Sequence, residues 1–328
     1  MKNKILSLVT FFFSISNLFS QNNDSIYNWK YNTITHELLE TEKHFSDLPD
    51  ELYDKMFIRL DSIIDKASIS ISPILRDTTL TKKDKALNIL KSISLTIEHF
   101  NFSLYIPTKN LTTMFLTNRV DCDTGAMLYI AIAEVNKLPL YLVEVPDHNF
   151  VRYYYDEANY FNWDNNTSME VTDSEYKNGM SQTSSSLFTI DDAVLFRYLQ
   201  PMSIGSVKAY YYSLIDGKKN IPKMKKLYEF AIKESPHNPL IMNNYSWFIL
   251  TNKEYEGSIA DNKLALELSL KVDELMPQDS NYKDTLGCAY AANENFKKAI
   301  EIETKYGGND FKQVNGYMMK KKCVNLNL

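Results

Sequence analysis

The sequence predicts an α+β protein, in which a buried helix packs on a small antiparallel sheet and an all-α domain of helical repeats follows. Two observations lead to this expectation. An almost wholly apolar helical segment leads into three strand-like segments between residues 121 and 164, and similar helical segments recur after residue 206 at an offset of 41 residues. The chain also has only 9 glycines among its 328 residues. So few glycines suit a largely helical protein, because glycine supplies most left-handed turns.

Composition and charge exclude several classes of protein. Hydrophobic residues make up 44% of the chain and charged residues 23%, a balance typical of folded rather than disordered proteins. The length is sufficient for two domains of ordinary size. The net charge is −5, and no long stretch is rich in lysine and arginine. A nucleic acid is therefore not expected as a partner, because binding phosphates needs clustered basic side chains.

The first twenty residues have the order of segments that is typical of a secretory signal peptide. Lys2 and Lys4 precede an apolar run over 5–13, and polar residues begin at Gln21. The run is too short to span a bilayer, and no cysteine lies near the expected cleavage point to carry a lipid anchor. We predict a signal peptide at 1–20 and an exported protein, periplasmic or secreted, that is not an integral membrane protein afterwards. An N-terminal anchor helix is the alternative.

The region before residue 100 has apolar side chains at helical spacing. Pro49 and Asp50 offer a start for one helix and Pro73 a stop, and a second helix follows Thr81. We expect both helices to supply core packing and no chemistry. Together with the sheet they form a predicted domain over residues 21–205.

The central region contains the buried helix and the sheet. Asp121 is placed to cap a helix that has Cys122 in its first turn and ends near Lys137. Segments rich in β-branched and aromatic residues follow at 140–145, 148–155 and 160–164. Residues 172–189 are rich in serine and threonine, which predicts a loop at the rim of the site or a lid over it.

The region after residue 206 contains an internal repeat. Residues 231–236 are echoed by residues 272–277, each segment ends in proline, and a similar helix follows each. Ser246 and Gly287 occupy matching positions, where we expect neighbouring helices to approach closely. The pattern resembles degenerate tetratricopeptide repeats, whose period of about 34 residues would be lengthened by an insertion near Gly257.

This resemblance implies a helical domain over residues 206–328, with two helix pairs and a frayed end at 320–322. Its concave face would bind a protein or an extended peptide, although such repeats also act as packing buttresses. Fortuitous similarity between helices is the alternative.

The chain has three cysteines, Cys122, Cys288 and Cys323. An odd, small number does not make a disulfide framework. A bridge between Cys288 and Cys323 remains open, and it would leave Cys122 single. Catalysis is one reason for a single thiol in an exported protein.

Cys122, His148 and Asp164 have the residue types of a cysteine hydrolase, which needs a thiolate, an imidazole and a group that orients the imidazole. A helix N-terminus favours the thiolate through unpaired N–H groups and the helix dipole, and Cys122 is expected there. The same N–H groups could stabilise an oxyanion. His148 is the only histidine in this region and opens a strand, and Asp164 ends the next one.

Three stretches of the sequence, 121–124, 145–152 and 162–164, resemble the transglutaminase-like superfamily of papain-type folds. The resemblance implies that Cys122 is the nucleophile, His148 the general base and Asp164 the orienting residue. It covers roughly residues 118–166. Val120 departs from the glycine that is common in the family at that place, so the approach to the nucleophile is expected to be more crowded.

The sequence leaves two functions open. One is an exported thiol hydrolase or acyltransferase that acts on amide bonds of proteins or peptides. The other is a non-catalytic interaction module that uses the cleft and the repeats to bind a partner. No cofactor is expected, because histidines and cysteines lack metal-ligand spacing, and no glycine-rich phosphate loop is present. Asp121 and Asp123 are better explained by helix capping. Tyr105 and Asn110 are candidates for a polar helper at the oxyanion site.

Strand register decides whether Asp164 or Asn165 orients His148. Side chains alternate faces along a strand, so cross-strand partners share a face. If paired residues of strands 148–155 and 160–164 have numbers with an even sum, Asp164 shares a face with His148; an odd sum selects Asn165. The turn between the strands has no glycine and lacks the Asn-Gly or Asp-Gly pair of two-residue turns. We therefore predict an odd-length loop and a hydrogen bond between Asp164 and His148.

Overall fold

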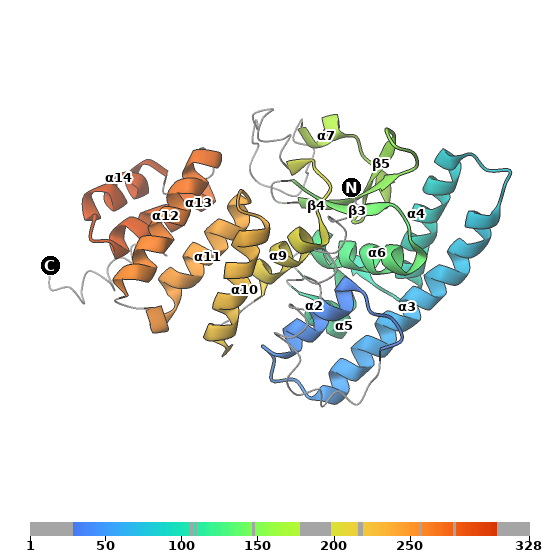
Figure 1. Ribbon diagram of the computed structural model, residues 1–328, viewed down its shortest axis with the longest axis horizontal. Coiled ribbons are helices and arrows are strands. Elements are labelled where there is room, and N and C mark those ends of the chain that lie inside the picture. The colour runs from blue at the N-terminus through green and yellow to red at the C-terminus, as the bar shows by residue number, and fades with distance from the viewer. Residues whose placement is uncertain are drawn as a thin grey trace, which may run out of the picture.

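The computed structural model describes residues 29–104, 108, 110–145, 148–177, 198–215, 219–255, 258–277 and 280–306. Within these ranges the chain forms twelve α-helices and two small sheets, which confirms the prediction of mixed α and β structure. Figure 1 shows the sheet and helices α2 to α6 gathered together, with helices α9 to α14 leading away from them toward the C-terminus. The predicted signal peptide, Tyr105 and Cys323 lie outside the described residues, as does the segment 320–322.

Helix α3 (Asp50–Arg76) begins where the sequence predicts, with Pro49 as its N-cap. It passes through Pro73, so the predicted stop at this residue was wrong. Proline removes one backbone donor from a helix, but the N–H of Asp77 still donates to the carbonyl of Pro73 at 3.1 Å. That bond closes one more turn after the proline.

The other elements of the N-terminal part are short helices and a small parallel sheet. They are α2 (Ile34–Lys43), α4 (Lys82–His99), β1 (Ser103–Leu104), α5 (Leu111–Thr117) and β2 (Arg119–Val120). Helix α4 follows Thr81, as predicted, and the Thr81 side chain caps it by accepting from the N–H of Asp84. Strands β1 and β2 pair in parallel and lead the chain into the central helix.

Helix α6 (Cys122–Asn136) packs against α3 on one side and the main sheet on the other. The main sheet is antiparallel, and its four strands lie in chain order. They are β3 (Leu140–Val145), β4 (His148–Tyr154), β5 (Tyr160–Asp164) and β6 (Met169–Glu170). A buried helix on a small antiparallel sheet is therefore present.

The register of β4 and β5 agrees with the prediction. Val151 pairs with Trp163, and Tyr154 pairs with Tyr160, so the paired numbers have an even sum. Five residues, 155–159, connect the two strands. Asp164 consequently lies on the same face of the sheet as His148.

The segment after the sheet differs from the prediction of a continuous loop over 172–189. Residues Asp173–Lys177 form a short helix, α7. Thr172 starts it by accepting from the N–H of Glu175, and the Glu175 carboxylate accepts in return from the N–H and hydroxyl of Thr172. The serine- and threonine-rich remainder, 178–189, lies outside the described residues.

The C-terminal region consists of consecutive helices, each packed on its neighbours. They are α9 (Ile204–Leu214), α10 (Ile221–Glu234), α11 (Pro239–Thr251), α12 (Ile259–Leu275), α13 (Ser280–Ala292) and α14 (Phe296–Tyr306), with a 3₁₀ turn at Lys253–Tyr255. The bounds of α11 and α13 differ by the predicted offset of 41 residues, as do the last residues of α10 and α12. The internal repeat therefore extends to the helix boundaries.

Ser246 and Gly287, the two small residues of the repeat, have different surroundings. Ser246 is fully buried, and its hydroxyl donates to the carbonyl of Ala265 and contacts the hydroxyl of Ser269. A Cβ on Gly287 would meet Ile302 at 3.8 Å, an ordinary van der Waals contact. Neighbouring helices therefore approach closely at both positions, since the backbone carbonyl of Ala299 in α14 would lie 3.9 Å from that Cβ, although a Cβ would fit there without a shift.

Helix α9 joins the two parts of the molecule. Its Tyr211 hydroxyl donates to the buried carboxylate of Glu42 in α2 and accepts from the N–H of Leu111 at 2.7 Å. Its neighbour Tyr210 reaches the first turn of α6. The division of the chain at residue 205 stays a prediction, but a cut there would remove both tyrosines from the part of the molecule that they bind.

Candidate active site

Cys122 is the first residue of α6, at the end of the sheet where β4 begins. Asp121 caps the helix, as predicted, with one carboxylate oxygen accepting from the N–H of Thr124 at 2.9 Å. The other oxygen accepts from the N–H of Thr108 at 3.0 Å. These bonds fix the start of the helix and leave the half-buried Cys122 thiol at its N-terminus.

His148 and Asp164 form a direct pair. The Nε2 atom of His148 lies 2.7 Å from Oδ2 of Asp164, and both side chains are about nine-tenths buried. Because the partner is a carboxylate, we assign the Nε2 proton to this hydrogen bond. The Nδ1 atom is then the nitrogen left to exchange a proton with another group.

Asp164 is prepared to carry a negative charge. Burial alone would raise its pKa, but the hydrogen bonds from His148 and Thr167 outweigh burial and lower the pKa overall. Its second oxygen, Oδ1, accepts from the N–H groups of Asn166 and Thr167 at 3.0 and 2.9 Å. A carboxylate held in this way keeps an imidazole in one tautomer and one orientation.

Tyr176 of α7 covers the pair and was not identified from the sequence. Its hydroxyl donates to Oδ2 of Asp164 at 3.3 Å, the same oxygen that His148 contacts. Its ring stacks on Phe150 with the centroids 4.2 Å apart and lies 5.8 Å from the ring of His148. Cys122 raises the pKa of Tyr176 electrostatically, so the Tyr176 hydroxyl also lies within the electrostatic range of the thiol. The only sequence signal was one aromatic residue in a segment that we interpreted as a loop.

Asp123 does not cap the helix, in contrast to the interpretation of Asp121 and Asp123 as a capping pair. Its Oδ1 accepts from the Tyr210 hydroxyl at 2.7 Å and from the side-chain amide of Asn149. The carboxylate is buried, and burial raises its pKa. A second acid is therefore present next to the thiol, on the side of the sheet that faces α9.

The thiol is not in the activated state that we expected at a helix N-terminus. Burial raises the pKa of Cys122 above its usual range, and the neighbouring Asp123 carboxylate raises it further. Backbone N–H groups of Asn149 and Asp123 act in the opposite direction but do not compensate. As a donor the thiol makes a long contact of 3.8 Å with Asp123, and among the described residues no hydrogen bond joins it to His148. The resting thiol is consequently neutral near pH 7.

Asn165, the alternative partner of His148, lies elsewhere in the site. Its side-chain amide donates to the carbonyl of Cys122 at 3.1 Å. A Cβ on Gly125 would come within 2.9 Å of the amide nitrogen, so only glycine leaves room for it without a shift. Asn165 therefore packs on the first turn of α6, and of these two neighbouring residues it is Asp164 that bonds to the imidazole.

Asn110, one of two suggested helpers at the oxyanion site, has a structural role. Its side chain caps α5 by accepting from the N–H of Thr113 at 2.8 Å. Within the described ranges no group of histidine, cysteine and acidic residues has the arrangement of a metal site. In the same ranges, no helix combines the length and apolarity needed to cross a bilayer.

In comparisons with known proteins, no family model and no curated protein matches this chain. The interpretation of the site thus rests on its own geometry and on the resemblance in residues 118–166.

Proposed function

We propose that the protein is an exported thiol hydrolase or acyltransferase of the transglutaminase-like, papain-type class, acting on amide bonds of proteins or peptides. Cys122 would be the nucleophile, His148 the general base and Asp164 the orienting residue. The observation that carries the proposal is the buried hydrogen bond of 2.7 Å between His148 and Asp164, beside the helix start that holds Cys122.

The neutral resting thiol fits general-base catalysis rather than a preformed ion pair. In the first step, Nδ1 of His148 takes the Sγ proton as Sγ bonds to the amide carbonyl carbon. The C–N bond then breaks, and His148 returns the proton to the departing amine. The acyl-enzyme that remains is released by water in hydrolysis or by another amine in acyl transfer.

The second candidate, a non-catalytic interaction module, is favoured by a different observation. Burial and Asp123 both hold the thiol in its unreactive form, and the long thiol contact leads to a carboxylate instead of an imidazole. In that case the residues around Cys122 would shape a binding surface, and the helices after residue 204 would bind the partner.

Labelling by a thiol-reactive probe separates the two candidates. The exported form of the full chain is treated with iodoacetamide, and labelling is measured peptide by peptide for all three cysteines. The catalytic proposal expects Cys122 to react faster than Cys288 and Cys323, with a pH dependence that His148→Ala removes. Slow labelling of Cys122 that is unaffected by His148→Ala would favour the interaction module.

A further inference from the structure

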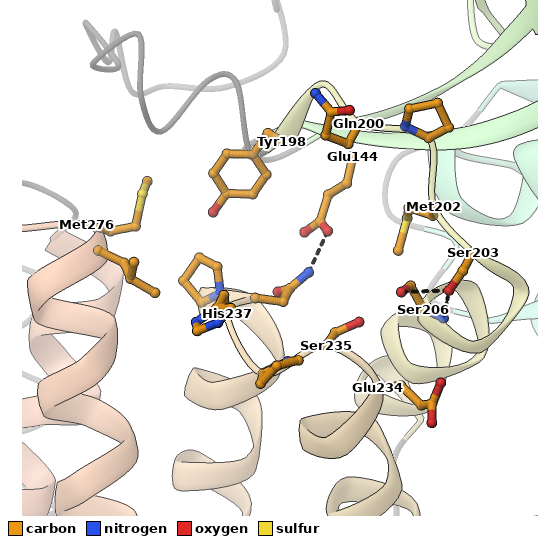
Figure 2. Close-up of a pocket in the computed structure, with 15 residues that line it drawn as sticks. Glu144, Tyr198, Gln200, Met202, Ser203, Ser206, Glu234, Ser235, His237 and Met276 are labelled. Atoms are coloured by element: carbon orange, nitrogen blue, oxygen red, sulfur yellow. Dashed lines mark hydrogen bonds between the residues drawn. The ribbon is translucent and has the colours of Figure 1, made fainter.

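A cavity of about 550 Å³ lies between the main sheet and the C-terminal helices. Figure 2 shows it bordered by the edge of the sheet, the starts of α9 and α11 and the ends of α10 and α12. Cys122 and His148 do not line it. Its volume is within the range of small-molecule sites, about 300–1,000 Å³.

The Glu144 side chain extends from β3 into this cavity (Figure 2). The residue is only 7% exposed, and its Oε2 accepts from the side-chain amide of Asn238 at 2.5 Å. Among the described residues no other group bonds to the carboxyl. The second oxygen, Oε1, is not completely buried, so it can be reached from the cavity. One oxygen is thus held by the protein, and the other is left for a ligand.

Among the described residues, the surroundings of Glu144 contain further acids, and the lining residue that can become cationic is His237 at the rim. No lysine or arginine is among the residues that line the cavity. Asp123, which reaches Tyr210 and Asn149 on the same side of the sheet, repels the charged form of Glu144. A buried carboxylate costs free energy unless a positive group pairs with it. A cationic ligand would therefore stabilise the ionised form of Glu144.

The rest of the wall is suited to an aliphatic chain. Tyr198, Met202, Leu275 and Met276 contribute apolar surface, and Val143 and Phe150 pack behind Tyr198 and Met276. An aromatic face can also attract an ammonium group. A ligand with one positive end and a short apolar chain would use both parts of the cavity.

We propose that this cavity binds an aliphatic primary ammonium group, with Glu144 as its charged partner. The group could belong to a free amine or to a lysine side chain of a protein, and the two share this chemistry. The proposal does not depend on thiol catalysis, because none of the three predicted catalytic residues lines the cavity.

Binding should depend on pH in a defined direction. Burial, with a smaller contribution from Asp123, raises the pKa of Glu144 to about 8. The carboxyl is then mostly protonated at pH 6.5 and ionised at pH 9, while an alkylammonium stays charged until about pH 10. Affinity should therefore increase between pH 6.5 and 9. The other titratable groups around the cavity are Glu234 and His237 at its rim and Tyr198 in its wall, and Tyr210 of α9 interacts electrostatically with Glu144 from outside the lining.

Ligand-observed NMR with pentylammonium and with pentan-1-ol, on the full exported chain, tests the proposal. Pentylammonium should bind saturably and at least about tenfold more tightly than the alcohol, since one charge-assisted hydrogen bond contributes that much. Glu144→Gln should remove the preference for the cation and the increase with pH. Glu229→Gln, an exposed acid on α10 away from the cavity, is the matched control and should change neither. Nα-acetyl-lysine N-methylamide, if it binds more tightly than pentylammonium, identifies a protein side chain as the source.

Two outcomes would overturn the proposal: equal binding of the alcohol and the ammonium, or full binding to Glu144→Gln. Ser235→Phe provides a second variant that leaves Glu144 in place. Ser235 lines the cavity and is half-buried, and its φ of −135° is open to any L-residue, so the larger side chain should fill the space. Unchanged pentylammonium binding to a folded Ser235→Phe protein would place the amine outside this cavity.

Discussion

The two faces of the main sheet each hold a buried acid, and the pKa values of these two acids are shifted in opposite directions. On one face, Asp164 receives hydrogen bonds from His148, Asn166 and Thr167, and its pKa is lowered despite burial. On the other face, Glu144 receives one hydrogen bond, from Asn238, and burial raises its pKa to about 8. Both residues are more than nine-tenths buried. The hydrogen bonds that Asp164 receives thus outweigh the effect of burial on its pKa, whereas the single hydrogen bond to Glu144 does not.

The largest expected effect is on the Asp164 face. His148→Ala should lower the activity toward an amide substrate by about 10³-fold or more, because the thiol then has no group to accept its proton. The rate of acyl-enzyme formation measures this effect. His99→Ala, a change at an exposed histidine of α4, is the matched control. Equal losses in the two variants would contradict the role of His148.

A smaller loss is expected from Asp164→Asn. The amide keeps the size of the side chain but removes the charge that stabilises the imidazolium, so we expect a loss in the same assay that is about 10- to 100-fold smaller than that of His148→Ala. Glu170→Gln, at an exposed acid of β6, should have no effect. Activity close to that of the wild type in Asp164→Asn would mean that the hydrogen bond of 2.7 Å is structural only.

On the face of the sheet that contains Glu144, we predict that Glu144→Gln changes the free energy of unfolding. The pKa of Glu144 is higher in the folded protein than in the unfolded chain, so the protonated carboxyl stabilises the fold most at a pH below the unfolded-state pKa. This stabilisation is lost as the pH rises through the folded-state pKa of about 8. Glu144→Gln, which can still accept from Asn238, removes that loss. At pH 8 the variant should be more stable than the wild type by on the order of 2–4 kcal/mol, with a smaller gain at pH 5. Urea denaturation at both pH values measures it, and an equal gain at both would contradict the raised pKa.

The features that the sequence predicted depend on local patterns. The helix starts after Thr81 and Asp121 and the register that brings Asp164 to His148 follow from residues close together in the chain, and the repeat offset follows from the similarity of two segments 41 residues apart. A signal peptide, export and the division at residue 205 stay predictions, as does the catalytic role of the three site residues.

The features that the sequence did not predict depend on distant parts of the chain. Tyr210 is 87 residues from Asp123, and Asn238 is 94 residues from Glu144. The periodicity of the sequence does not indicate such partners, because they are determined by how α9 and α11 pack on the sheet. The same contacts explain why the thiol pKa moved opposite to expectation: a helix N-terminus is a local feature, whereas burial beside Asp123 is a tertiary one.

The smallest expected effect links the two faces, because Asp123 influences both the thiol and Glu144. In Asp123→Asn the side-chain oxygen can still accept from Tyr210 and Asn149, but the negative charge next to Cys122 is gone. The thiol pKa should therefore decrease, and alkylation of Cys122 by iodoacetamide at pH 8 should be about tenfold faster, the change that one pKa unit gives. Glu157→Gln, which removes an exposed charge in the loop between β4 and β5, is the control and should leave the rate unchanged. If Asp123→Asn also leaves it unchanged, burial alone keeps the thiol neutral, and the two faces of the sheet are electrostatically independent.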